Sequence, residues 1–155
     1  MSAYRILFVC LGNICRSPMA EYVLRHHARQ AGVEQRIAVS SSGTSGWHNG
    51  ENMHQGTRKT LAKHGINHSG FTSSQVQTGD DGYYDFLIAM DDDNLAELER
   101  MFGRRPEKIF KLTDLIPSSG YNHVPDPWYT GDFDETFRLV SEGSRALLKK
   151  LGLAE

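Results

Sequence analysis

The sequence predicts an α/β protein in which a four-stranded, mostly parallel sheet has helices on both faces and a phosphate-binding loop after its first strand. Three observations predict this fold. Short apolar, β-prone runs alternate with segments that carry apolar side chains at helical spacing. The chain has 155 residues, which suits one domain over residues 1–155. It also has no internal repeat and no linker long enough to divide it.

The expected elements follow this alternation along the chain. The first strand covers residues 4–9, whose apolar run is typical of a strand buried on both faces. Ser17 and Pro18 suit the start of a helix, with Ser17 as its cap, and Gly32 can end that helix. We expect further strands at residues 37–41, 86–90 and 109–112, and further helices at residues 57–64, 95–102 and 137–151.

Composition and charge exclude several classes of protein. The 17 basic and 19 acidic residues leave a net charge of −2, which argues against nucleic-acid binding. The longest apolar run, residues 6–11, is far shorter than the ~20 residues that span a bilayer. The first residues lack the layout of a signal peptide. Two cysteines cannot form a disulfide framework, so we expect a cytoplasmic monomer that contacts neither membrane nor nucleic acid.

The segment after the first strand has the residue types of an oxyanion site. Ligands of such sheets bind beyond the carboxyl ends of the strands, where this segment lies. Gly12 and Asn13 tolerate positive φ, so successive backbone N–H groups can point into one concavity at a helix N-terminus. Arg16 adds a planar cation that can grip two oxygens, and Ser17 can donate to a thiolate. Cys10, at the base of this cradle, is a candidate nucleophile.

An ordinary interpretation exists for each of these residues. Cys10 alone could be a small core side chain, and Arg16 could be a solvated residue at a helix start. The combination of a cysteine, five residues, an arginine and a serine, with Gly-Asn inside, favours the reactive site, because reactive cysteines lie in electropositive surroundings.

Residues 9–18 resemble the active-site loop of the low-molecular-weight protein tyrosine phosphatases. Three further segments match this family in the same order: Thr44-Ser45-Gly46-Trp47, Met90-Asp91 with Asn94, and Asp126-Pro127-Trp128-Tyr129. The similarity therefore extends over nearly the whole chain. The Cys-x5-Arg motif alone is shared by unrelated phosphatase folds. Its place near the N-terminus, together with the distant Asp-Pro pair, is much more specific.

The resemblance implies hydrolysis of phosphotyrosine and small aryl phosphates through a phosphocysteine intermediate, with no metal and no cofactor. Cys10 would be the nucleophile and Arg16 the charge clamp, while Asp126 would protonate the tyrosyl oxygen and later act as the base toward water. The implied partners are phosphotyrosine-containing proteins, and free phosphate or other oxyanions in the loop. The residues implied to bind substrate form the loop and its rim: Leu11, Gly12, Asn13, Ile14, Cys15, Ser17, Trp47, Trp128 and Tyr129.

From the residues alone, two of these assignments have alternatives. Asp126 lies between two prolines, which suits a rigid and partly desolvated acid, but Asp-Pro pairs also favour simple turns. Trp47 alone would suit the core. The glycines around it, with His48 and Asn49, indicate an exposed loop instead.

Positions behind the loop are also implied by the resemblance. Ser41 and Asn13 would hold the loop in shape, and Asp91 would orient Arg16 or another group of the site. From the residues alone, Asp91-Asp92-Asp93 could instead be an acidic cluster at a helix N-terminus. The chain departs from the family pattern at residues 71–74, where many relatives have a histidine followed by Ala-Arg. It also departs at residues 54–56, where an acidic residue followed by Pro-Arg is common. These departures concern the support of the loop and the rim, where a hydrogen bond is either missing or replaced.

Two other functions stay open on the sequence. A thiol-dependent arsenate reductase resembles this fold but relays electrons through downstream cysteines, and none follows Cys15. A non-catalytic phosphotyrosine-binding module would keep Arg16 but has no need for both Cys10 and Asp126. Cys10 and Cys15 also suggest a protective disulfide after oxidation of Cys10, against the alternative that Cys15 only packs beneath the loop.

Overall fold

The computed structural model of the protein describes residues 3–154. Its sheet has four strands in the order β2-β1-β3-β4, and every neighbouring pair is parallel. The strands are β1 at Tyr4–Cys10, β2 at Ile37–Gly43, β3 at Phe86–Ala89 and β4 at Ile109–Lys111. The α/β class and the four parallel strands predicted from the sequence are thereby confirmed.

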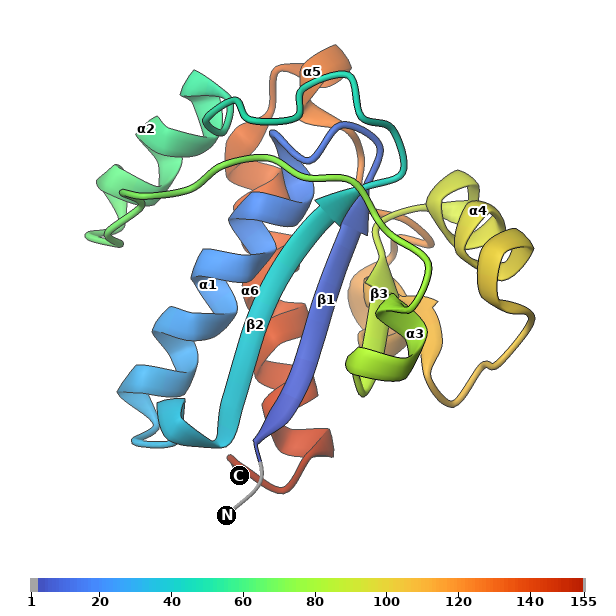
Figure 1. The fold of residues 1–155 in the computed structure, drawn as a ribbon. Helices are drawn as coiled ribbons and strands as arrows, with labels where there is room; N and C mark the ends of the chain where they lie inside the picture. Colours follow the sequence, from blue (N-terminus) through green and yellow to red (C-terminus); the bar gives the residue numbers. More distant parts are fainter. Residues whose placement is uncertain (1–2, 155) are drawn as a thin grey trace.

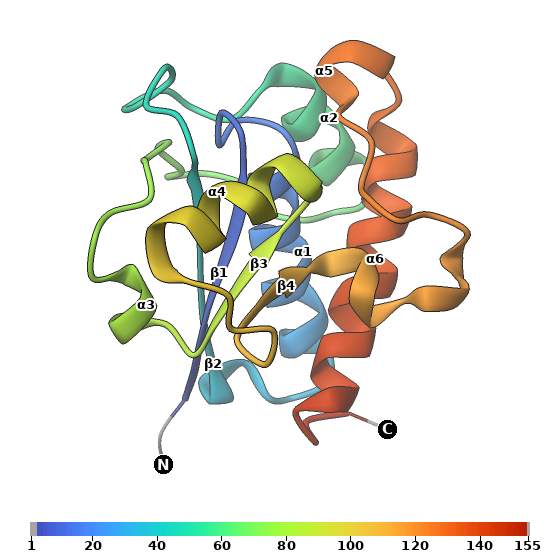
Figure 2. The same ribbon diagram turned by 90° about the vertical axis from the view of Figure 1, so that its right-hand side faces the viewer.

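Helices cover both faces of the sheet (Figures 1 and 2). One face carries α1 at Arg16–Gln30, α2 at Gln55–Lys63 and α6 at Phe133–Lys150, and the other carries α4 at Asp92–Phe102. Successive β1 residues explain why both faces are covered. Ile6 and Phe8 point into the larger core under α1 and α6, while Leu7 and Val9 point into the smaller core with Leu98 of α4. No helix within residues 3–154 is long and apolar enough to cross a membrane.

The carboxyl ends of β1 and β2 lie at the end of the molecule opposite the two chain ends (Figure 1). Cys10, the last residue of β1, is paired with Gly43, the last residue of β2. A Cβ atom on Gly43 would lie 2.7 Å from the backbone oxygen of Leu11, so only glycine lets β2 approach the following loop this closely. The strand order thus places the loop after β1 at a shared, open edge.

The structure differs from the sequence-based expectation at the start of α1. Ser17 is not the cap, because the helix begins at Arg16 and Cys15 occupies the cap position without a side-chain hydrogen bond. The hydroxyl of Ser17 lies near Cys10 instead. Two short helices were also not predicted, α3 at Asp80–Tyr83 and α5 at Pro127–Thr130. Each has only four residues, which is too short for a helical repeat of apolar side chains to show.

Candidate active site

The loop between β1 and α1 has one residue in a strained backbone conformation. Asn13 has φ of 56°, in the left-handed region. Gly12 does not adopt positive φ among the described residues, so the prediction of two such positions is wrong for Gly12. Glycine suits this position because it has no side chain: a Cβ atom there would lie 3.0 Å from Cδ2 of His48. One left-handed residue is therefore enough to fold this loop.

A set of buried hydrogen bonds holds Asn13 in that conformation. Its Nδ2 donates to Ser17 Oγ (2.9 Å) and to Ser41 Oγ (3.0 Å). Its Oδ1 accepts from the backbone N–H of Ser74 (2.9 Å), and its carbonyl accepts from Ser73 Oγ (2.7 Å). The hydrogen bond that the departure at residues 71–74 put in doubt is therefore replaced, because Ser73 and Ser74 donate directly to Asn13 of the loop. The predicted role of Ser41 and Asn13 in shaping the loop agrees with these contacts.

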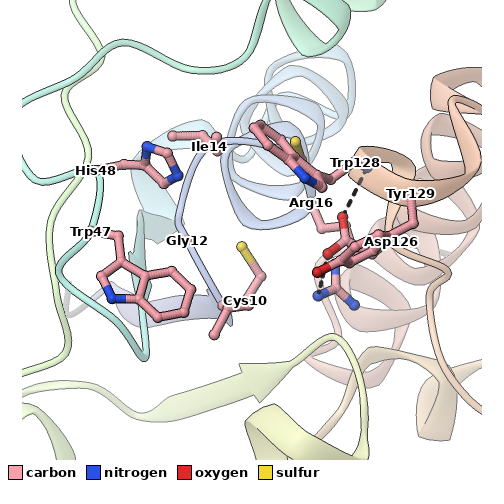
Figure 3. A pocket seen from close by; sticks show the side chains of 11 residues that line it. Cys10, Gly12, Ile14, Arg16, Trp47, His48, Asp126, Trp128 and Tyr129 are labelled. Atoms are coloured by element: carbon pink, nitrogen blue, oxygen red, sulfur yellow. Dashed lines mark hydrogen bonds and ion pairs between the residues drawn. The ribbon is translucent and has the colours of Figure 1, made fainter.

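Cys10 lies at the floor of a cavity of about 150 Å³. Its side chain is buried, and its Sγ is 2.9 Å from Ser17 Oγ. Figure 3 shows the sulfur at the centre, with Trp47 and His48 on one side and Asp126 on the other. The lining residues come from the loop, from the segment after β2 and from the segment around α5: Cys10, Leu11, Gly12, Ile14, Cys15, Arg16, Trp47, His48, Asp126, Trp128 and Tyr129.

Two of the predicted substrate-binding residues do not line this cavity. Asn13 and Ser17 are completely buried and lie beneath the loop, where they support it. Both carry short polar side chains, which suit contact with substrate and support of a loop equally well, so the residue type could not separate the two roles. The other predicted residues, including the distant Trp47, Asp126 and Trp128, come together around Cys10.

Arg16 is buried and holds three separate parts of the site together. Its NH1 donates to Asp91 Oδ2 (2.8 Å) and to the carbonyl of Val124 (2.9 Å), and its NH2 is 3.6 Å from Asp126 Oδ2. Burial alone would lower the pKa of Arg16, but the negative charges of Cys10, Asp91 and Asp126 outweigh it and raise that pKa. The guanidinium is thus a fixed positive charge beside the sulfur, oriented by Asp91 as the resemblance implied.

Asp126 lies in a turn and lines the cavity at the same time. It caps α5, where its Oδ1 accepts from the backbone N–H of Trp128 (3.0 Å). Its Oδ2 faces Arg16 and the cavity (Figure 3). The side chain is 22% exposed, so water and a leaving group can both reach it. The turn therefore places the carboxyl group at the cavity, so capping α5 and facing the cavity are compatible for this side chain.

The rim of the cavity is aromatic and exposed. Trp47, Trp128 and Tyr129 are 75%, 55% and 79% exposed. This exposure agrees with the prediction that Trp47 lies in a surface loop. His48 also lines the cavity, which sequence reasoning missed. Its place beside Trp47, in a segment rich in glycine and asparagine, was the available signal.

The departure at residues 54–56 has a structural role in the rim. The backbone N–H of His54 donates to the carbonyl of Ile14 (2.7 Å), and its ring lies 5.6 Å from that of Trp128 and 5.1 Å from that of Phe133. Gly56 is required beside it, since a Cβ atom there would lie 2.4 Å from the Phe133 ring. His54 therefore connects the loop between β1 and α1 to α5, the helix that carries Trp128 and Tyr129.

Among the described residues, no cluster of three or more histidine, cysteine, aspartate or glutamate side chains is placed to hold a metal ion. Positive charge at the cavity comes from Arg16 and from the backbone N–H groups at the start of α1.

Comparisons with known proteins agree with this geometry. Residues 5–154 match the family model described as low molecular weight phosphotyrosine protein phosphatase. The chain is 42% identical over 147 residues to the low molecular weight protein-tyrosine-phosphatase YfkJ of Bacillus subtilis, with 94% of each chain covered. It is similar to the crystal structure of YfkJ, with a TM-score of 0.94, 41% identity, and 98% and 96% of the two chains covered.

Two further solved structures extend the comparison. A protein tyrosine phosphatase from Entamoeba histolytica with Hepes in its active site has a TM-score of 0.90 at 31% identity, with 97% of each chain covered. A Drosophila arginine phosphatase has a TM-score of 0.86 at 29% identity, with 94% and 96% of the two chains covered. The match of the family model over nearly the whole chain settles the relationship. The chain belongs to the low molecular weight phosphotyrosine protein phosphatase family.

Proposed function

We propose that this chain hydrolyses phosphotyrosine in proteins, and small aryl phosphates, through a phosphocysteine intermediate on Cys10. The observation that carries the proposal is the placement of three groups around one cavity: the Cys10 sulfur at the floor, with Arg16 and Asp126 on one wall. Family membership supports the reaction class, a phosphoric monoester hydrolase.

In the first step the Cys10 thiolate attacks phosphorus. The bond between phosphorus and the tyrosyl oxygen breaks, and Asp126 gives its proton to that oxygen. Arg16 and the backbone N–H groups of the loop stabilise the negative charge on the three equatorial oxygens. A phosphate dianion in the cavity competes with Asp126 for the guanidinium of Arg16.

In the second step a water molecule attacks the phosphocysteine. Asp126, now a carboxylate, takes a proton from that water, the phosphorus–sulfur bond breaks, and inorganic phosphate leaves. The sulfur departs as a thiolate, stabilised by the hydroxyl of Ser17 at 2.9 Å. The cycle thus returns both Cys10 and Asp126 to their starting forms.

The rim supports selection of phosphotyrosine. An aryl phosphate holds its phosphorus farther from the peptide backbone than a serine phosphate does, so it can reach the buried sulfur from the exposed rim. Trp47 and Trp128 present flat apolar surfaces to the aromatic ring. We further propose that the protein acts as a monomer in a reducing, cytoplasmic compartment, which keeps Cys10 in its active thiol form.

The decisive experiment measures turnover of a phosphotyrosine peptide, a phosphoserine peptide and phosphoarginine by the wild type and by Cys10→Ser. We expect wild-type turnover of phosphotyrosine well above the other two substrates, and loss of activity in Cys10→Ser. Preference for phosphoarginine or phosphoserine would overturn the proposed substrate class. A parallel assay of arsenate reduction with added thiol tests the arsenate reductase alternative, and binding of phosphotyrosine without turnover would indicate the non-catalytic module.

A further inference from the structure

We propose that Glu21 is a positioning residue for this reaction: acting through Ser41 and Asn13, its carboxylate orients the proton that Ser17 donates to the Cys10 sulfur. The inference rests on the proposed function, and it concerns a residue outside the cavity. The series of hydrogen bonds that carries it is continuous from the carboxylate to the sulfur.

Glu21 is a buried carboxylate on the sheet-facing side of α1, one helical turn after Ser17. Its Oε1 accepts from Ser41 Oγ (2.7 Å) and its Oε2 accepts from NH2 of Arg25 (2.8 Å). The same NH2 of Arg25 also donates to the carbonyl of Val39 in β2 (2.9 Å). Burying a carboxylate is costly unless it is paired. Here its two partners fix both of its oxygens.

These partners determine the direction of each hydrogen bond in the series. An ionised carboxylate only accepts, so Ser41 must donate its single proton to Glu21. The Ser41 oxygen is then free only as an acceptor, and it receives Nδ2 of Asn13. The Asn13 amide is held in the matching orientation at its other end, where its Oδ1 accepts from the backbone N–H of Ser74.

The last hydrogen bond in the series, between Ser17 and the Cys10 sulfur, is directed in the same way. The second proton of Asn13 Nδ2 is donated to Ser17 Oγ, which leaves the Ser17 hydroxyl proton as the donor in its other contact. Two acceptors are within reach of that proton, the Cys10 Sγ at 2.9 Å and the carbonyl of Ser42 at 3.4 Å. The shorter contact is to the sulfur. Glu21 therefore biases Ser17 toward donation to Cys10, as a thiolate needs when it attacks and when it leaves.

The test compares variants that cut this series with a matched control. Glu21→Gln keeps the side-chain shape but has only one carbonyl oxygen, which accepts the hydrogen bond from Arg25. Its amide N–H group then faces Ser41, so the Ser41 proton loses its acceptor. Ser41→Ala cuts the series at the next residue. Ser141→Ala is the control, because Ser141 is as buried as Ser41 (both 6% exposed) and bonds to His27 and Arg145 between α1 and α6.

Three quantities are measured for each variant: kcat for p-nitrophenyl phosphate, the competitive inhibition constant of inorganic phosphate, and the melting temperature. We expect kcat to fall about tenfold in Glu21→Gln and in Ser41→Ala, which is the effect of one hydrogen bond to a charged group. In Glu21→Gln, phosphate inhibition should stay within about twofold, because the loop keeps the hydrogen bonds of Asn13 to Ser17 and Ser74. Ser141→Ala should keep its kcat. Should Glu21→Gln fail to fold, Glu21→Asp replaces it, because its shorter side chain withdraws the carboxylate from Ser41.

The double variant separates a relay from two independent structural roles. If Glu21 acts through Ser41, adding Glu21→Gln to Ser41→Ala causes no further loss of kcat. Losses that multiply, an unchanged kcat in Glu21→Gln, or phosphate inhibition that weakens in step with kcat would each overturn the inference. The wild type provides the separate check: absence of wild-type turnover contradicts the proposed function, whereas equal turnover by wild type and Glu21→Gln contradicts only the role of Glu21.

Discussion

The floor and the rim of the cavity are built in opposite ways. The floor, taken together with the wall and the loop support beside it, comprises Cys10, Arg16 and Asn13; all three are buried, and each makes side-chain hydrogen bonds to other buried groups. On the rim, Trp47 and Tyr129 are exposed by three quarters or more, and neither makes a side-chain hydrogen bond among the described residues. The floor is therefore fixed before a substrate arrives, while the rim is free to adjust to one.

This difference separates the reaction from selection. A charge clamp stabilises a transition state only if its donors are already oriented, because reorientation during the reaction costs free energy. An aromatic rim needs no such order, since stacking tolerates several ring positions. Changes on the floor should therefore reduce kcat strongly, and changes on the rim should act mainly on KM and on the choice of substrate.

The largest effect is expected from Cys10→Ser. Without the sulfur no phosphocysteine can form, so turnover of p-nitrophenyl phosphate should fall to below a few per cent of wild type. The fold should persist, because serine keeps a group that can bond to Ser17, and thermal melting checks this. Arg16→Ala should lose activity to a similar degree. It should also lower stability, since Asp91 and the Val124 carbonyl lose their partner.

The next effect is expected from Asp126→Asn, which removes the proposed proton donor on the wall above the floor. Aryl phosphates with poor leaving groups should slow by about 100- to 10,000-fold, and those with good leaving groups far less, because a good leaving group departs without a proton. The measurement is kcat/KM across a series of substituted phenyl phosphates. Equal losses across the series would remove Asp126 from the role of acid.

A third prediction tests whether Cys15 protects the floor. Both cysteines are free thiols. Burial and the neighbouring charge of Cys10 raise the pKa of Cys15 to about 12, so Cys10 is the first to react with peroxide. Wild type treated with peroxide and then dithiothreitol should recover more activity than Cys15→Ser. Equal recovery, together with no Cys10–Cys15 linkage by mass spectrometry, would show that Cys15 only packs beneath the loop.

On the rim, Trp47→Ala should raise KM for a phosphotyrosine peptide several-fold and leave kcat for p-nitrophenyl phosphate nearly unchanged. The side chain is 75% exposed, so its removal leaves the floor in place. A matched change in the loop itself, at the half-buried Gly12, should instead reduce kcat, because the Cβ atom of Gly12→Ala would press on His48. If Trp47→Ala reduced kcat as strongly as Gly12→Ala, the separation of floor and rim would be wrong.

The last prediction concerns stability at alkaline pH rather than activity. The folded chain holds the Cys15 proton up to a pKa of about 12, whereas the unfolded chain releases it near the ordinary value of 9.0. Stability should therefore fall as pH rises from about 9 toward 12, by up to about 1.4 kcal/mol per pH unit from this group. Urea unfolding of wild type and Cys15→Ala at several pH values measures the difference in slope. Parallel slopes would contradict the burial of this thiol.

The sequence predicted the long helices because their apolar side chains repeat over several turns, and the sheet because each strand is a run of several apolar residues. Residue types and spacing singled out Cys10 and Arg16, whereas Asp126 was assigned only through the family resemblance, because an Asp-Pro pair also suits a simple turn. All three lie around one cavity. The sequence misplaced the start of α1 at Ser17, because a serine near a helix start fits both a cap and a contact to a nearby sulfur. It could not show that Glu21 bonds to Ser41, since that contact depends on how α1 packs on β2.

The central claim is that the Cys10 sulfur carries the phosphoryl group during turnover. Its most direct test is to mix the enzyme with excess p-nitrophenyl phosphate, quench with acid within one turnover, and measure the mass of the peptide that contains Cys10. The account predicts that this peptide gains one phosphoryl group in the wild type and gains none in Cys10→Ser. A wild type that turns over substrate while its Cys10 peptide stays unmodified, or carries the group on another residue, would contradict it.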